Sequence, residues 1–268
     1  MGKFLKLALL LGLLLPSAAS AHAFGQRFDL PLPLWLFQWG AGAALVLSFV
    51  VTGLFVREPV ATTRNESRSG WSPPGWLAST ARFLAIVLFG LAVVATVIGS
   101  GFSYSNFAPT FFWIIVWIGL PTLAFFFGNI WEAINPWRTI FGWVRGVALN
   151  PKSYPAWLGV WPAFLLYAFF TWMELVPGNG YLPNILGALL VGYTMVLIIG
   201  AAFFGVPWIR NAEFFTVISR LVGAVSPVGW RDGRAHLRLP GKGLFNLDHM
   251  APGLIPFTLL FLSGVTYD

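Results

Sequence analysis

Residues 184–204 read NILGALLVGYTMVLIIGAAFF, and this stretch decides the fold class. It carries no acidic or basic side chain, and it is long enough for the helix of about 20 apolar residues that crosses a hydrocarbon core. Windows of similar character occur at 34–56, 80–101, 111–127 and 157–176, with an interrupted one at 251–266. The sequence predicts an all-α polytopic membrane helix bundle with five complete spans and one partial span.

Composition supports this class. The chain is 57% hydrophobic and only 9% charged, whereas a soluble domain is about 25% charged. A net charge of +7 reflects basic residues that flank the spans, as membrane topology requires, so nucleic-acid binding is disfavoured. Cysteine is absent, which removes disulfides, thiolate metal sites and cysteine nucleophiles.

The N-terminus has the features of a secretory signal peptide. Lys3 and Lys6 precede the apolar run 7–15, and Ala19-Ser20-Ala21 forms a small-residue cleavage site. We expect a signal peptide at 1–21 and a single transmembrane domain at 22–268; the alternative is an uncleaved signal anchor. Cleavage makes His22 the first residue of the mature chain, on the outer side.

Basic residues set the predicted orientation. The predicted outer loops 102–110 and 177–183 contain no Lys or Arg, and Arg27 is the only basic residue outside in the mature chain. Because Lys and Arg concentrate in cytoplasmic loops, we expect a bacterial inner-membrane protein with its mature N-terminus on the periplasmic side.

The segment 205–249 is the longest stretch without a span. Asn211 is a candidate cap for a helix that places Phe214, Phe215, Ile218, Leu221 and Val222 on one side. We interpret it as an interfacial helix on the inner membrane face. A turn-rich basic stretch, 227–234, follows and suits anionic lipid.

A polar cluster interrupts the chain after the third window, in GNIWEAINPWR at 128–138. Pro136 suits the first turn of a new helix with Asn135 as its cap. Glu132, Asn135 and Arg138 therefore crowd together with Asn129, and they are the candidate catalytic residues. Glu132 either pairs with Arg138 as a structural lock or accepts a proton in a cavity.

The predicted mature N-terminus is a candidate metal site. The free amine and imidazole of His22 suit copper or zinc, and Asp29, Glu174 or a partner chain would complete the ligand set. The alternative is a Pro-rich lead into the first span. A weaker set, His236, Asp248 and His249, matches no compact ligand motif and has solvated loop residues as its alternative.

Two stretches carry a family resemblance. HAFGQRFDLPLPLW at 22–35 and FGNIWEAINPWR at 127–138 resemble bacterial polytopic membrane proteins labelled fenitrothion hydrolase. The resemblance implies hydrolysis of the P–O–aryl bond of an organophosphorothioate, with release of a nitrophenol. Metal-bound hydroxide commonly assists such reactions. Members of this group look longer and continue past a position like Tyr267-Asp268.

The partial window 251–266 leads to an expectation about partners. We expect a second membrane subunit that completes the helix bundle, unless the sequence is a fragment or the sixth helix is simply short. The predicted function is a subunit of a membrane-bound organophosphorus hydrolase that takes a small apolar substrate from the lipid bilayer. The alternatives are a transporter or channel-like protein for a metal or a small apolar molecule, and a non-catalytic assembly or copper-handling subunit.

Overall fold

The computed structural model describes residues 70–144, 151–176, 180–247 and 251–267, together with Trp39, Ala43, Val46, Leu47 and Val50. The chain divides into two compact units, Phe24–Arg68 and a larger one formed by Met1–Ala23 and Ser69–Asp268. The five isolated positions belong to the smaller unit, where each is helical and exposed. The predicted signal peptide, and most of the predicted span at 34–56, lie outside the described residues. All elements named from α3 onward belong to the larger unit.

Four helical segments in the described part of the chain are long and apolar enough to cross a membrane. They are α3 (Gly75–Ile98), Phe107–Phe127, Ala156–Leu175 and α9 (Pro183–Phe204). The second joins α4 (Phe107–Thr110), the π-helical stretch η2 (Phe111–Gly119) and α5 (Leu120–Phe127). The third contains the short turn η4 (Ala156–Leu158) and α8 (Trp161–Leu175). These segments confirm the predicted windows at 80–101, 111–127, 157–176 and 184–204.

Local sequence explains where these helices begin and end. The Asn106 side chain caps α4 by accepting a hydrogen bond from Ala108 N at 2.9 Å, and Pro183 opens α9, where its missing N–H costs nothing. Gly128 and Gly205 end α5 and α9 at φ values of 76° and 71°, a conformation that favours glycine.

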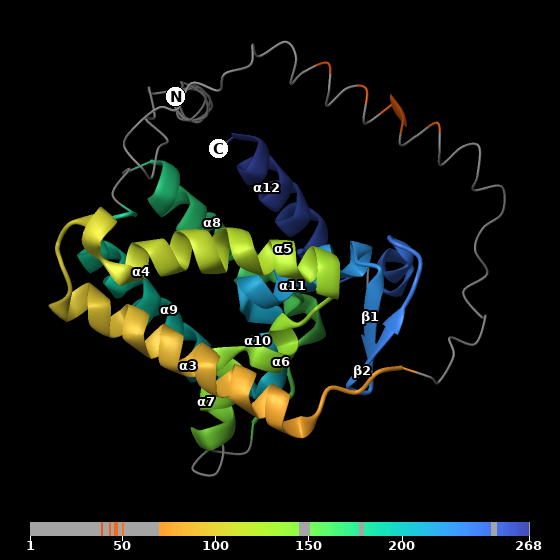
Figure 1. Cartoon of the computed structure of the whole chain (residues 1–268), viewed down its shortest axis with the longest axis horizontal. Coiled ribbons are helices and arrows are strands. Elements are labelled where there is room, and N and C mark those ends of the chain that lie inside the picture. Colours follow the sequence, from red (N-terminus) through yellow and green to blue (C-terminus); the bar gives the residue numbers. More distant parts are fainter. Residues whose placement is uncertain are drawn as a thin grey trace, which may run out of the picture. The chain divides into compact units, whose positions relative to one another are not determined.

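Contacts between helix ends show that α3 runs antiparallel to Phe107–Phe127 and to α9 (Figure 1). Asn106 Nδ2 donates to Ala95 O at 2.8 Å, which joins the start of α4 to the end of α3. A β-carbon at Gly187, near the start of α9, would overlap the side chain of Thr96 in α3. The ends of α5 and α9 therefore lie at the opposite end of the bundle, which we call the Phe204 end. Lys152 N donates to Phe203 O at 2.7 Å, so the chain also enters α8 from the Phe204 end.

Shorter elements connect and cover these spans. They are η1 (Ser103–Ser105), α6 (Trp131–Ile134), α7 (Pro136–Val144), α10 (Val206–Ala212), α11 (Phe214–Val225), β1 (Val228–Arg231), β2 (Arg234–Leu237), η5 (Lys242–Asn246) and α12 (Leu254–Tyr267). β1 and β2 form an antiparallel hairpin whose turn residues, Asp232 and Gly233, both have positive φ, as a tight two-residue hairpin turn requires. Trp230 Nε1 donates to Phe127 O at 2.8 Å, which fixes the hairpin at the Phe204 end. α12 occupies the partial window at 251–266.

The prediction of an interfacial helix within 205–249 is wrong. The helix exists, but α11 begins at Phe214 with Glu213, not Asn211, as its cap. Its residues are buried or partly buried along its whole length, and none is exposed. In Figure 1, α11 lies among the other helices, in the interior of the bundle. An interfacial helix keeps a polar face in water, whereas α11 packs against α5, α8, α10 and η5.

Candidate functional site

A fully buried carboxylate, Glu213, stands between α10 and α11. Its Oε1 accepts a hydrogen bond from Phe215 N at 2.9 Å, and its Oε2 accepts one from Thr216 N at 2.8 Å and one from the Thr216 hydroxyl. Glu213 thus satisfies the first free N–H groups of α11 with its own side chain. The helix dipole further favours a negative charge at this position.

Three side chains from other parts of the chain also donate to this carboxylate. Oε2 accepts hydrogen bonds from Trp131 Nε1 at 2.8 Å and Asn135 Nδ2 at 3.0 Å, and Oε1 accepts one from Tyr193 Oη at 2.9 Å. We call Glu213 with Trp131, Asn135, Tyr193 and Thr216 the Glu213 network. Because every contact to the carboxylate is a donor, the network suits its ionised form, which only accepts hydrogen bonds.

The Glu213 network lies halfway along the spans. Tyr193 is the middle of α9, about 15 Å from either end at a helical rise of about 1.5 Å per residue. Phe214, next to Glu213, packs against Tyr193 and against Tyr167, near the middle of α8, at ring-centroid distances of 5.0 and 5.6 Å. Phe215 packs against Trp117, the middle of Phe107–Phe127, at 6.1 Å. If these helices cross a bilayer, Glu213 lies near its midplane.

Residues 205–225 enter and leave the bundle at one end. α10 starts at the Phe204 end and packs back along α9, so that Glu213 reaches Tyr193. α11 then runs back to the Phe204 end. Gly223, near its C-terminus, lies so close to Gly128 and Asn129 at the end of α5 that a β-carbon there would overlap their backbone. We call 205–225 the re-entrant segment. Such non-spanning backbone at membrane depth is tolerated only where protein buries it or a cavity adjoins it.

Both ends of α11 are capped by charged side chains. At the C-terminal end, Arg238 Nε donates to Ser226 O at 3.0 Å, and Nη2 donates to Gly223 O at 2.5 Å and Ala224 O at 3.3 Å. A cation at the C-terminus and a carboxylate at the N-terminus each complement the helix dipole. The charges of Glu213 and Arg238 therefore offset the partial charges at the two ends of α11.

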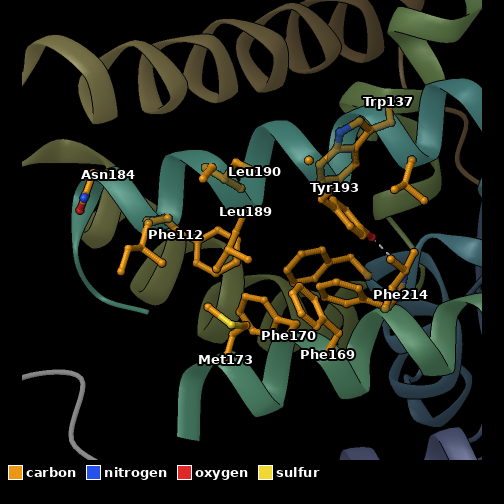
Figure 2. A pocket seen from close by; sticks show the side chains of 17 residues that line it. Phe112, Trp137, Phe169, Phe170, Met173, Asn184, Leu189, Leu190, Tyr193 and Phe214 are labelled. Carbon is orange, nitrogen blue, oxygen red and sulfur yellow. Dashed lines mark hydrogen bonds between the residues drawn. The ribbon is translucent and has the colours of Figure 1, made fainter. Parts of the chain in front are cut away.

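An apolar cavity of about 630 Å³ adjoins the network. We call it the central cavity; its walls include Phe169, Phe170 and Met173 from α8, Asn184 and Leu189 from α9, and Phe112 from η2. Tyr193 also lines it, and Figure 2 shows its ring between the cavity and α11. The Tyr193 hydroxyl donates to Glu213 and accepts from Phe214 N at 3.1 Å, the dashed line of Figure 2. A tyrosine that lines the cavity is therefore joined to the buried carboxylate through its hydroxyl.

The π-helical stretch η2 supplies part of this wall. Phe112 and Trp117 are five residues apart, the hydrogen-bond spacing of a π-helix, and both rings contact Phe215, at 6.2 and 6.1 Å. Aromatic pairs at such distances add to the stability that burial alone provides. π-Helical geometry inside α-helices recurs at functional sites, and here it faces the start of α11.

The predicted cluster at 128–138 separates into two parts. Arg138 Nη1 and Glu132 Oε1 pair at 2.9 Å with side chains 44% and 54% exposed, respectively, which agrees with the lock interpretation. Asn135 caps α7 as predicted, since its Oδ1 accepts from Arg138 N at 3.0 Å. Its Nδ2, however, turns inward to Glu213. Of the three candidate catalytic residues, only Asn135 joins the buried network.

The predicted metal sites gain no support. His22, Asp29, Asp248 and His249 lie outside the described residues, and His236 sits in β2 opposite Gly229. Within the described ranges, no group of three His, Cys, Asp or Glu side chains is placed to hold a metal ion. The copper or zinc site at His22 stays a prediction.

Sequence reasoning missed Glu213 altogether. Its signal was an acidic residue directly before the apolar run 214–225, where the helix dipole favours a carboxylate and burial without partners is costly. No protein-family model matches the chain, and no curated protein or solved structure matches it. The resemblance to proteins labelled fenitrothion hydrolase therefore stays untested.

Proposed function

We propose that this chain is a membrane transporter subunit that binds a small, uncharged, mainly aromatic molecule in the central cavity. The observation that carries the proposal is the re-entrant segment, which brings the Glu213 network against the wall of this cavity halfway along the spans. Transporters commonly place discontinuous helices at their substrate sites near the midplane.

The lining selects the class of ligand. Ligand pockets are mostly apolar, with a few placed polar groups that fix orientation, and here Tyr193, Asn184 and Trp137 are the polar residues among the described ones that line the cavity. A half-helix N-terminus often binds an anionic substrate group. At α11 that position is taken, because Phe215 N and Thr216 N already donate to Glu213. An uncharged ligand is the better fit.

The coupling of ligand to conformation would pass through Tyr193. A ligand that accepts a hydrogen bond from the Tyr193 hydroxyl competes with Glu213, which lies at the start of α11. A ligand moves an equilibrium only by its different affinity for two states. Competition at this hydroxyl provides such a difference for any movement of α11.

A second candidate is the predicted organophosphorus hydrolase. The observation in its favour is Tyr193, which lines an apolar cavity suited to an aryl phosphorothioate and whose hydroxyl has a carboxylate within hydrogen-bond distance as a proton acceptor. The expected product is a nitrophenol. This activity would require Tyr193, whereas apolar ligand binding would survive Tyr193→Phe.

The binding proposal is tested by photolabelling reconstituted protein with an aryl diazirine and mapping the labelled peptides. We expect competitor-sensitive labelling of α8 and α9 around Met173 and Leu189. Gly192 lines the cavity and a β-carbon there meets nothing within 4 Å, so Gly192→Leu should fill the space and remove the label. The matched control is Gly90→Leu in α3, which also has open space. Diffuse labelling that ignores Gly192→Leu would contradict the proposal.

Two further measurements separate the candidates. Accumulation of a radiolabelled aryl compound in cells should differ between wild type and Gly192→Leu if the chain transports it. Nitrophenol release from an aryl phosphorothioate by the same membranes, lost in Tyr193→Phe, would make the hydrolase the better conclusion.

A further inference from the structure

A second cavity of about 340 Å³ lies between α5, α8, α11 and α12 and is separate in chemistry from the central cavity. We call it the α8 cavity. Along α8 it is lined by Tyr167, Thr171 and Glu174, which are spaced four and three residues apart and so share one helix face. A phenol, a hydroxyl and a carboxylate thus follow one another from the middle of the span toward its end at Leu175.

Aromatic rings form the rest of this lining. Trp117, Phe215 and Phe261 join Tyr167 around the cavity. The rings form a connected set, with centroid distances of 6.1 Å from Trp117 to both Tyr167 and Phe215, and 6.3 Å from Tyr167 to Phe261. Tyr167 is 1% exposed, so its ring is held in place by packing.

Two details indicate a space that is built for polar contact. The buried hydroxyl of Thr171 lies next to the Tyr167 hydroxyl and interacts with it. On the α12 side the wall contains Gly264, where a β-carbon would lie 3.2 Å from the Tyr167 hydroxyl. The Tyr167 and Thr171 hydroxyls together offer hydrogen-bonding groups to the polar part of a ligand.

We propose that the α8 cavity binds a small organic ammonium ion, with Glu174 as the counter-charge and the rings of Trp117, Tyr167, Phe215 and Phe261 as its cage. Aromatic faces attract ammonium groups within about 6 Å of the ring centroid. Glu174 is the one carboxylate among the described residues that line this cavity.

The proposal does not depend on the function proposed for the central cavity. The two cavities share Phe215 alone among their lining residues, and they differ in chemistry, since only the α8 cavity is lined by a carboxylate. An uncharged aromatic molecule and an organic cation therefore have different sites in this chain. A lipid acyl chain is the competing occupant of the α8 cavity, and it would need no charge.

Choline is the probe, and dimethylbutanol, in which carbon replaces its nitrogen, is the matched neutral compound. Binding of each to the full chain in nanodiscs is measured by titration calorimetry. We expect choline to bind at least about tenfold more tightly than dimethylbutanol, since charge and cation–π attraction act on choline alone. Equal binding of both, or no binding of choline by folded protein, would overturn the proposal.

Variants then locate the site. Glu174→Gln and Phe261→Leu should each weaken choline binding about tenfold or more, while leaving the affinity for dimethylbutanol within about twofold. Glu132→Gln, which removes an exposed carboxylate elsewhere, and Gly192→Leu, which fills the central cavity, should leave choline binding unchanged. Loss of choline binding in Gly192→Leu but not in Glu174→Gln would overturn the assignment to this cavity. The comparison of choline with dimethylbutanol on wild type keeps the test valid if a variant fails to fold.

Discussion

Replacing Glu213 with alanine is the most informative perturbation of the buried site. Glu213 is 0% exposed, and its loss leaves four donors without an acceptor: Trp131 Nε1, Tyr193 Oη, Phe215 N and the Thr216 hydroxyl. The two remaining donors keep an acceptor, because Asn135 Nδ2 also bonds Thr216 Oγ, and Thr216 N also bonds Glu213 O. A stranded buried donor costs about 1–3 kcal/mol, so Glu213→Ala should cost about 4–12 kcal/mol.

Glutamine gives an intermediate case. With its oxygen at the Oε2 position it still accepts from Trp131, Asn135 and Thr216, and its amide group then faces Tyr193 and Phe215 N. Tyr193 can accept a hydrogen bond from the amide, but its own O–H and Phe215 N are then both without an acceptor. Two stranded donors predict a loss of about 2–6 kcal/mol.

The matched control is Glu132→Ala, which removes an exposed carboxylate paired with Arg138. Exposed pairs contribute about 0–1 kcal/mol, so this variant should resemble wild type. Unfolding in mixed micelles, followed by circular dichroism, should rank wild type and Glu132→Ala above Glu213→Gln, and Glu213→Gln above Glu213→Ala. A Glu213→Ala protein within about 1 kcal/mol of wild type would refute the claim that these donors depend on the carboxylate.

Three other variants test separate features. Gly187→Leu should cost about 1–3 kcal/mol because its side chain would overlap Thr96, whereas Gly90→Leu should be tolerated; thermal unfolding in detergent compares the two. Arg238→Met should cost about 1.5–3 kcal/mol in the same assay by freeing the carbonyls at the end of α11, and an Arg238→Met protein as stable as wild type would show that water caps them. Burial raises the pKa of Tyr154 to about 12. Burial of the neutral phenol therefore stabilises the fold fully below the ordinary tyrosine pKa of 10.0, and this stabilisation is lost as the pH rises toward about 12. Ultraviolet titration should therefore separate wild type from Tyr154→Phe only near the top of that range, and a difference below pH 10.0 would contradict this burial.

The spans could be predicted because their signal is local. Residues 184–204 contain no charge, and a long uncharged apolar run has few structures open to it other than a membrane helix. The cap of α7 was equally local, since Asn135 precedes Pro136, and both preferences belong to adjacent residues. Neither prediction depended on residues in other parts of the bundle.

The buried site could not be predicted because its evidence is non-local. Trp131 and Asn135 are separated from Glu213 by 82 and 78 residues in sequence. The run 214–225 is too short to span, and its apolar face suits an interfacial helix as well as a buried one. Arg220, a charged residue within the run, also suits the polar face of an interfacial helix. Packing of α5 and α8 around α11, which no residue of α11 itself specifies, decides between the two.

The central claim is that the re-entrant segment does not cross the membrane, and the absence of cysteine gives a direct test. Single cysteines are introduced at three exposed positions, Gly101, Lys152 and Arg234, and labelled in intact cells and in opened membranes with an impermeant maleimide. We predict that Lys152→Cys and Arg234→Cys react from the same side and Gly101→Cys from the other. Labelling of Lys152→Cys and Arg234→Cys from opposite sides would mean that 205–225 spans the bilayer, and would contradict the account.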